Sequence, residues 1–80
     1  MKIGEATAQR IKALLKEKNI TQYRLEQNSG IQHGTMQYII NGKNKDIEFG
    51  TIIMIAKGFD MNFLEFLNDP VFLSEELEAE

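Results

Sequence analysis

The side chains able to do chemistry are few, and they do not form a catalytic or metal-binding set. The chain of 80 residues has no cysteine and one histidine, His33, so a metal site would lack partners. No spacing suggests a nucleophile beside its base, and no glycine motif suggests a phosphate cradle. Residues 75–80 hold four glutamates, a charge run typical of a solvated tail. The sequence therefore argues against an enzyme and predicts no cofactor.

Residues 21–42 have the pattern of two short helices joined by a turn. Leu25 can anchor the first helix, while Met36 and Ile39, three residues apart, share one face of the second. Gly30 stands where the first helix must stop, and glycine accepts the positive φ that such a stop requires. A pair of helices with a glycine-containing turn is the helix-turn-helix pattern. The outer face of its second helix is a candidate for the DNA major groove.

Charge is divided unevenly along the chain. The net charge is −3, but residues 1–58 hold all nine Lys and Arg with five acids, a net +4, whereas residues 59–80 hold the other seven acids and no base, a net −7. This division is expected if one face meets phosphate and another faces away. A solvated surface with a solubilising tail explains it equally well.

Apolar periodicity and capping residues predict an all-α chain. After a frayed start at residues 1–4, we expect helices at residues 5–18, 22–29, 32 or 33–41, 46 or 48–59, and 63–67. Thr21 and Asn62 are suited to cap helices, and Asn19 to end one. The isoleucine-rich fourth helix should be central, with Phe49 in its buried surface. A strand there is the rival interpretation, which the helical pattern on both sides disfavours.

The chain has the size of one domain, with the last residues as an appendage. We expect a DNA-binding unit over residues 1–69 and an acidic tail over residues 70–80. No apolar run approaches the ~20 residues that span a membrane, and no signal peptide is recognisable, so a cytoplasmic protein is expected. Four of five phenylalanines fall between residues 59 and 72, either to close the core or to form a dimer seam. The candidate dimer contacts are Phe63, Phe66, Phe72 and Leu73.

From about residue 8 to residue 68, the sequence resembles the lambda-repressor-like, Cro-like helix-turn-helix proteins of the XRE family. The resemblance rests on residues 20–22, 30–31, 36, 39, 41–43, 55–57 and 62–67. It implies a compact bundle of five short helices, with helices two and three as the DNA-reading unit. It also implies a sequence-specific regulator of transcription. The simplest form is a small homodimeric repressor that reads an inverted repeat in double-stranded DNA.

The resemblance assigns two kinds of contact to matching positions. Gln22 would contact phosphate and brace the recognition helix. The residues implied to read base edges are Gln32, His33, Gly34, Gln37 and Tyr38. The residues implied to contact phosphate are Gln22, Thr35, Asn41, Lys43, Asn44 and Lys45. Amides and imidazoles can donate and accept at base edges, whereas lysines supply attraction independent of sequence.

Three residues depart from the family pattern. Glu26 replaces a small residue where helices two and three approach, so its carboxylate must reach solvent or find a buried partner. Gly34 has no side chain where a base-reading one is common, and it weakens its helix by ~1 kcal/mol relative to alanine. Asp60 stands in place of a common glycine, and aspartate tolerates the left-handed region.

Plainer interpretations stand beside these roles. His33 and Gln22 could be ordinary surface residues, Lys43 and Lys45 ordinary loop lysines, and Tyr38 could pack its ring on helix four. A second function is an antitoxin or accessory module that uses the same fold to bind a protein partner, a toxin or a regulator. Its contact surface would be the acidic, phenylalanine-rich C-terminal part.

Overall fold

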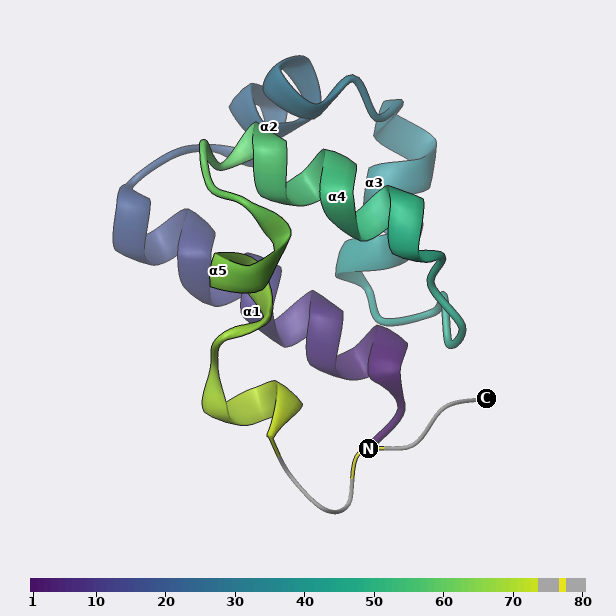
Figure 1. Cartoon of the computed structure of the whole chain (residues 1–80). Helices are drawn as coiled ribbons and strands as arrows, with labels where there is room; N and C mark the ends of the chain where they lie inside the picture. The colour runs from purple at the N-terminus through teal and green to yellow at the C-terminus, as the bar shows by residue number, and fades with distance from the viewer. Residues whose placement is uncertain (74–76, 78–80) are drawn as a thin grey trace.

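A computed structural model describes residues 1–73 and residue 77, and this part folds into α-helices (Figure 1). The elements are α1 (Ile3–Lys18), α2 (Gln22–Ser29), α3 (His33–Ile40), α4 (Phe49–Gly58), α5 (Phe63–Leu67) and the 3-10 helix η1 (Pro70–Phe72). The predicted all-α class with five short helices is confirmed. α2 and α5 have the predicted bounds, α1 begins two residues earlier, and α3 ends one residue earlier. α4 begins one to three residues later than predicted and ends one residue earlier.

The ends of the first three helices follow from local side-chain chemistry. Asn19 ends α1 in the left-handed region with φ 55°, as its short polar side chain allows. Thr21 caps α2, since its hydroxyl oxygen accepts the backbone N–H of Arg24 at 3.0 Å. Gly30 ends α2 with φ 77°, where a residue with a Cβ would be strained. The turn between α2 and α3 is therefore the predicted one.

The second half of the chain uses the same devices. Asp60 follows α4 with φ 59°. It adopts the left-handed region that aspartate tolerates, as we expected where the family commonly has glycine. Asn62 and Glu65 form a reciprocal capping box at the start of α5, with bonds of 2.9 and 3.1 Å. Pro70 begins η1 rather than continuing α5, because proline lacks the N–H that a helix interior needs.

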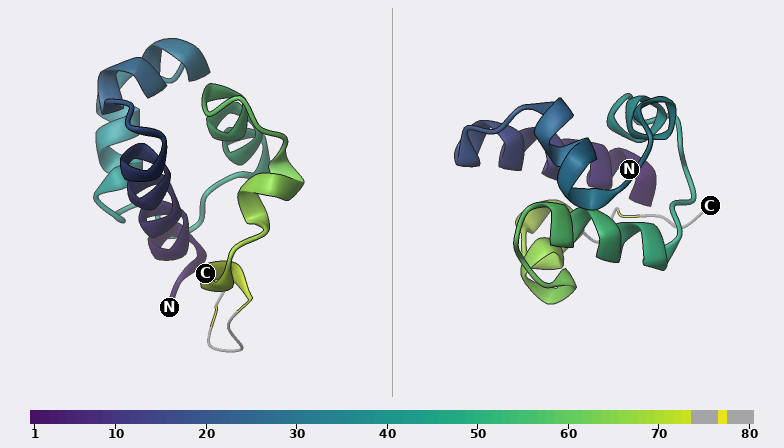
Figure 2. Two further views of the ribbon diagram at one scale, coloured as in Figure 1. Left: turned by 90° about the vertical axis from the view of Figure 1, so that its left-hand side faces the viewer. Right: turned by 90° about the horizontal axis from the view of Figure 1, so that it is seen from above.

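The helices divide into two groups around one core. Figure 2 (left) shows α1 and α3 on one side and α4 and α5 on the other, with α2 above them, and the closest packing is α2 on α4 and α3 on α1. Gly58 permits the close approach of α2 to α4, because a Cβ there would meet Leu25 and Ser29 at under 3 Å. None of the described helices has the length and apolar character needed to cross a membrane.

Phe66 lies at the centre of the core and is fully buried. Its ring lies 6.5 Å from that of Phe59 and 5.9 Å from that of Phe72. The prediction that Phe66 contacts a partner chain is therefore wrong, since its ring has no surface to offer. The other large, fully buried residues are Thr7, Ile11, Leu14, Leu25, Met36, Ile39 and Ile55.

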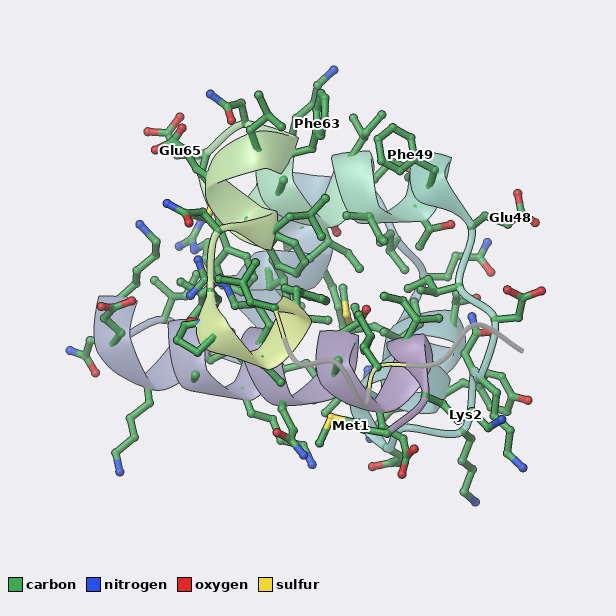
Figure 3. All side chains as sticks on the ribbon, turned by 60° about the horizontal axis from the view of Figure 1, so that its bottom comes forward. Met1, Lys2, Glu48, Phe49, Phe63 and Glu65 are labelled. Carbon is green, nitrogen blue, oxygen red and sulfur yellow. The ribbon has the colours of Figure 1, made fainter. Side chains whose placement is uncertain are left out.

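Two further expectations are wrong. The N-terminus is not frayed, because Ile3 begins α1 and the Gly4 N–H donates to the Lys45 carbonyl at 3.3 Å. Phe49 is not buried: its side chain is 53% exposed and projects beside Phe63 (Figure 3). Ile47, in the loop before α4, is buried in the core instead.

Candidate nucleic-acid interface

α3 has one buried face and one exposed face. Met36, Ile39 and Ile40 are buried, which turns the positions between them outward. The exposed residues include His33, Gly34, Gln37 and Tyr38, all predicted base readers. Tyr38 is 51% exposed, so its ring is not buried under α4. The structure thus brings these four residues onto the exposed side of one helix.

The residues at the two ends of α3 are accessible as well. Gln32 is the N-cap residue, with extended backbone and an exposed side chain, and Asn41 is the C-cap residue, also exposed. Thr35, in the first turn, is exposed. Each therefore lies where a DNA strand alongside α3 could be reached.

The lysine loop after α3, residues 43–45, is anchored at both ends by backbone hydrogen bonds. The Lys43 N–H donates to the Tyr38 carbonyl at 3.2 Å, and the Lys45 carbonyl accepts the Gly4 N–H. Lys43 and Lys45 are exposed, and Asn44 is half-buried. Asn44 packs against Gly4 so closely that a Cβ on Gly4 would overlap the Asn44 carbonyl oxygen. The two lysines therefore extend from a backbone held by both α1 and α3.

One carboxylate oxygen of Glu26 makes two hydrogen bonds, one within α2 and one that joins α2 to α3. Its Oε2 accepts Nε2–H of Gln22 at 2.8 Å and lies 2.8 Å from Nδ1 of His33. The side chain is only 8% exposed, so it has found hydrogen-bond partners rather than reaching solvent. Gln22 thus reaches the recognition helix by way of Glu26.

The ionised form of Glu26 is favoured. The hydrogen bond from Gln22 lowers the pKa of this carboxyl below its ordinary value, and His33 lowers it further by hydrogen bonding and by charge, against the opposing effect of burial. An open hollow of ≈ 260 Å³ lies over the carboxylate, lined by Gln22, Tyr23, Glu26, His33 and Gln37. Neither Tyr23 nor the role of Glu26 was predicted. The sequence signals were the need of Glu26 for a partner and the spacing of four residues between Gln22 and Glu26 on one helix face.

The predicted dimer contacts are scattered rather than gathered. Phe63 and Phe72 are half-buried, Leu73 is 71% exposed, and Phe66 is inside the core. Phe72 packs against the core, as part of η1. They do not form one exposed seam.

Two helices joined at a glycine turn, with a polar outer face on the second, define a helix-turn-helix domain of the class that binds DNA. The chain belongs to the family of Cro/C1-type HTH DNA-binding domains, which matches residues 10–70. This match confirms the predicted family and supports a DNA-binding regulator with double-stranded DNA as its partner. Comparisons with curated proteins and with solved structures gave no significant match.

Proposed function

We propose that this chain is a sequence-specific repressor of transcription that binds an inverted repeat as a homodimer. The observation that carries the proposal is the outer face of α3, where His33, Gln37 and Tyr38 are exposed beside a basic loop. Repression would follow from occlusion of a promoter. In this proposal residues 1–69 form the DNA-binding unit, and residues 70–80 are an acidic C-terminal segment that begins with η1, packed on the core.

The outer face of α3 and the residues at its two ends have different roles in this proposal. Gln32, His33, Gln37 and Tyr38 face base edges, where Gly34 lets the DNA approach the helix backbone closely. Lys43 and Lys45 contact phosphate with Asn41 and Asn44 at one end, as do Gln22 and Thr35 at the other. The anchored lysine loop supports this division, because a held backbone positions the lysine side chains beside the helix.

An exposed apolar surface on α4 and α5 favours a dimer. It consists of Phe49, Met54 and Leu64, which are 53%, 41% and 67% exposed, with the half-buried Ile53 and Phe63. The rings of Phe49 and Phe63 meet edge to face at 5.2 Å, and Figure 3 shows both projecting on the same side. Exposed apolar side chains that gather in this way mark interaction surfaces, and the contact of Phe49 with Phe63 is the centre of the one that we propose here.

A second copy of this chain is the occupant that the charges favour. Two exposed residues of opposite charge lie at the two ends of α4: Glu48 is its N-cap residue, and Lys57 is in its last turn. Antiparallel contact of two α4 helices about a twofold axis near Ile53 would bring Glu48 of each copy to Lys57 of the other. Such an isologous contact is self-complementary, as a C2 dimer requires. Gly50, with open space around it, would allow the helices to approach.

Salt-dependent binding tests the proposal, with a duplex that carries the site enriched by the wild-type chain from a random pool of double-stranded DNA. Lys43→Glu and Lys45→Glu should each weaken binding and lower the slope of log K against log salt by about one for each phosphate that is no longer neutralised. Lys16→Glu makes the same charge change at an exposed position of α1 outside the lysine loop, and it should leave the slope near that of the wild type. Equal slopes in all three variants would contradict the proposed phosphate contacts.

A protein-interaction module is the second candidate, because the same apolar surface could receive a different protein. A wild-type chain that stays monomeric, with and without DNA, would contradict the homodimer and favour this candidate. A monomer–dimer equilibrium in the micromolar range would support the repressor.

A further inference from the structure

We infer that Glu26 is a positioning residue that holds His33 with its proton on Nδ1, so that α3 offers DNA a hydrogen-bond acceptor, Nε2, near its N-terminus. The inference rests on the proposed function, because it specifies what one base-reading residue presents. It goes further in assigning a role in sequence preference to a buried carboxylate on α2.

The hydrogen bonds around Glu26 determine where the imidazole proton lies. An ionised carboxylate can only accept hydrogen bonds. Its Oε2 lies 2.8 Å from His33 Nδ1, a distance at which two acceptors would repel. Nδ1 must therefore carry a proton in this arrangement. The second bond to the same oxygen, from Gln22, restricts the carboxylate and so the imidazole ring.

The other ring nitrogen is left for a ligand. The His33 side chain is 67% exposed, although Nδ1 is engaged. Within the part of the chain that the structure describes, the imidazole ring of His33 makes its hydrogen bond through Nδ1, to Glu26. Neutral imidazole with its proton on Nδ1 has a lone pair on Nε2 and no second N–H. Its accessible edge is then an acceptor.

An acceptor at this position selects among bases. In the major groove, cytosine N4 and adenine N6 carry donors, whereas guanine presents only the acceptors N7 and O6. Neutral His33 should therefore favour cytosine or adenine over guanine. A protonated imidazole donates from both nitrogens, so lowering the pH should weaken this preference at the base that His33 meets.

Few other titratable groups face His33. The hollow beside it holds Glu26 and Tyr23, both from α2. The rest of α3 supplies Tyr38 and no acid or base. α1 also packs on α3, but its Glu5 and Lys12 lie near Asn41 and Gly42, at the far end. Among these groups, the carboxylate that contacts the imidazole ring is that of Glu26.

The state of the imidazole can be measured on the free protein without DNA. A long-range ¹H–¹⁵N correlation spectrum of the ¹⁵N-labelled chain contains one imidazole, because His33 is the only histidine. At about pH 8, where imidazole is ordinarily neutral, we expect Nδ1 protonated and Nε2 bare. Free histidine favours the opposite tautomer, so a spectrum with Nε2 protonated would overturn the inference. Glu26→Gln should shift the population toward that form, whereas Glu17→Gln, on an exposed part of α1, should not.

Selection of bound duplexes from a random pool at about pH 8 and about pH 5.5 tests the effect on DNA. For the wild type, we expect the preference for cytosine or adenine over guanine at one position to fall roughly tenfold or more at the lower pH. The base preference that His33→Gln shows should not differ between the two pH values, because an amide does not gain a proton in this range. The same base preference at both pH values would overturn the inference. Failure to bind any sequence would contradict the proposed function, and the spectrum of the free protein distinguishes the two failures.

Discussion

Arg10 of α1 contacts Phe66 of α5 in two ways, by a hydrogen bond to its backbone carbonyl and by a cation–π contact with its ring. Its Nε–H donates to the Phe66 carbonyl at 2.7 Å, and its guanidinium carbon lies 5.8 Å from the centre of the Phe66 ring. Its other N–H groups donate to the Glu65 carbonyl and to Asp69 Oδ2, each at 3.0 Å. With a side chain only 11% exposed, Arg10 satisfies the last carbonyls of α5 and ties them to α1.

Arg10→Lys should destabilise the fold although it keeps the charge. A lysine ammonium cannot reproduce the planar fork that serves two carbonyls and a carboxylate. We expect a loss of about 1.5–3 kcal/mol in the free energy of unfolding, the range for hydrogen bonds to charged groups. Urea unfolding followed by circular dichroism measures it. Arg24→Lys, at an exposed position of α2, is the control, and equal midpoints for the two variants would refute this role of Arg10.

Gly4→Ala should displace the lysine loop. The added Cβ would overlap the Asn44 carbonyl, and such overpacking typically costs about 1–3 kcal/mol. Affinity for DNA should fall with stability, because Lys43 and Lys45 would lose their supporting backbone. Gly34→Ala has open space around its Cβ and should instead stabilise α3 by about 1 kcal/mol. Thermal unfolding of both variants checks the opposite signs, and a Gly4→Ala protein as stable as the wild type would disprove the close contact.

Acid should remove the stabilisation that Glu26 supplies. Its pKa is lowered in the folded chain, so its contribution is fully present above the ordinary glutamate range and is lost as the pH falls through the lowered value. The urea midpoint should therefore decrease from about pH 5 to about pH 3 less steeply in Glu26→Gln than in the wild type. Glu17→Gln should retain the wild-type slope. Identical slopes for all three proteins would show that Glu26 has no lowered pKa.

If the chain forms the proposed dimer, Phe49→Ser should convert it to a monomer while leaving the fold intact. Phe49 is exposed on α4 and its ring contacts Phe63, so removing the ring takes away a large part of the apolar surface but none of the core. Sedimentation velocity measures the association. Leu73→Ser removes another exposed apolar side chain outside this surface and should remain dimeric. If Phe49→Ser dimerises as tightly as the wild type, the seam lies elsewhere.

Sequence reasoning succeeded where the determinants are local. The caps at Thr21 and Asn62 and the left-handed residues Asn19 and Gly30 depend on bonds and dihedral angles within a few residues. The bounds of α2 and α5 follow from them. The polar outer face of α3 was predictable for the same reason, because helical periodicity alone turns it away from Met36 and Ile39.

Contacts between distant residues were not predictable in this way. Nothing in the pattern of the fourth helix shows that Ile47 takes the buried place expected for Phe49. Gly4 gives no sign that Asn44 packs against it, and the bond from Arg10 to Phe66 spans 56 residues. The pairing of Glu26 with His33 depends on how α2 and α3 are oriented across their turn. For Glu26, the sequence indicated that a partner was needed but not which residue it would be.

The most direct measurement is selection of bound sequences by the wild-type chain from a random double-stranded DNA pool at about 150 mM salt. We expect an enriched inverted repeat whose half-sites are ~34 Å apart, or a multiple of that distance, as two α3 helices of a twofold dimer require. No enrichment, with circular dichroism showing a folded helical protein, would contradict a sequence-reading repressor.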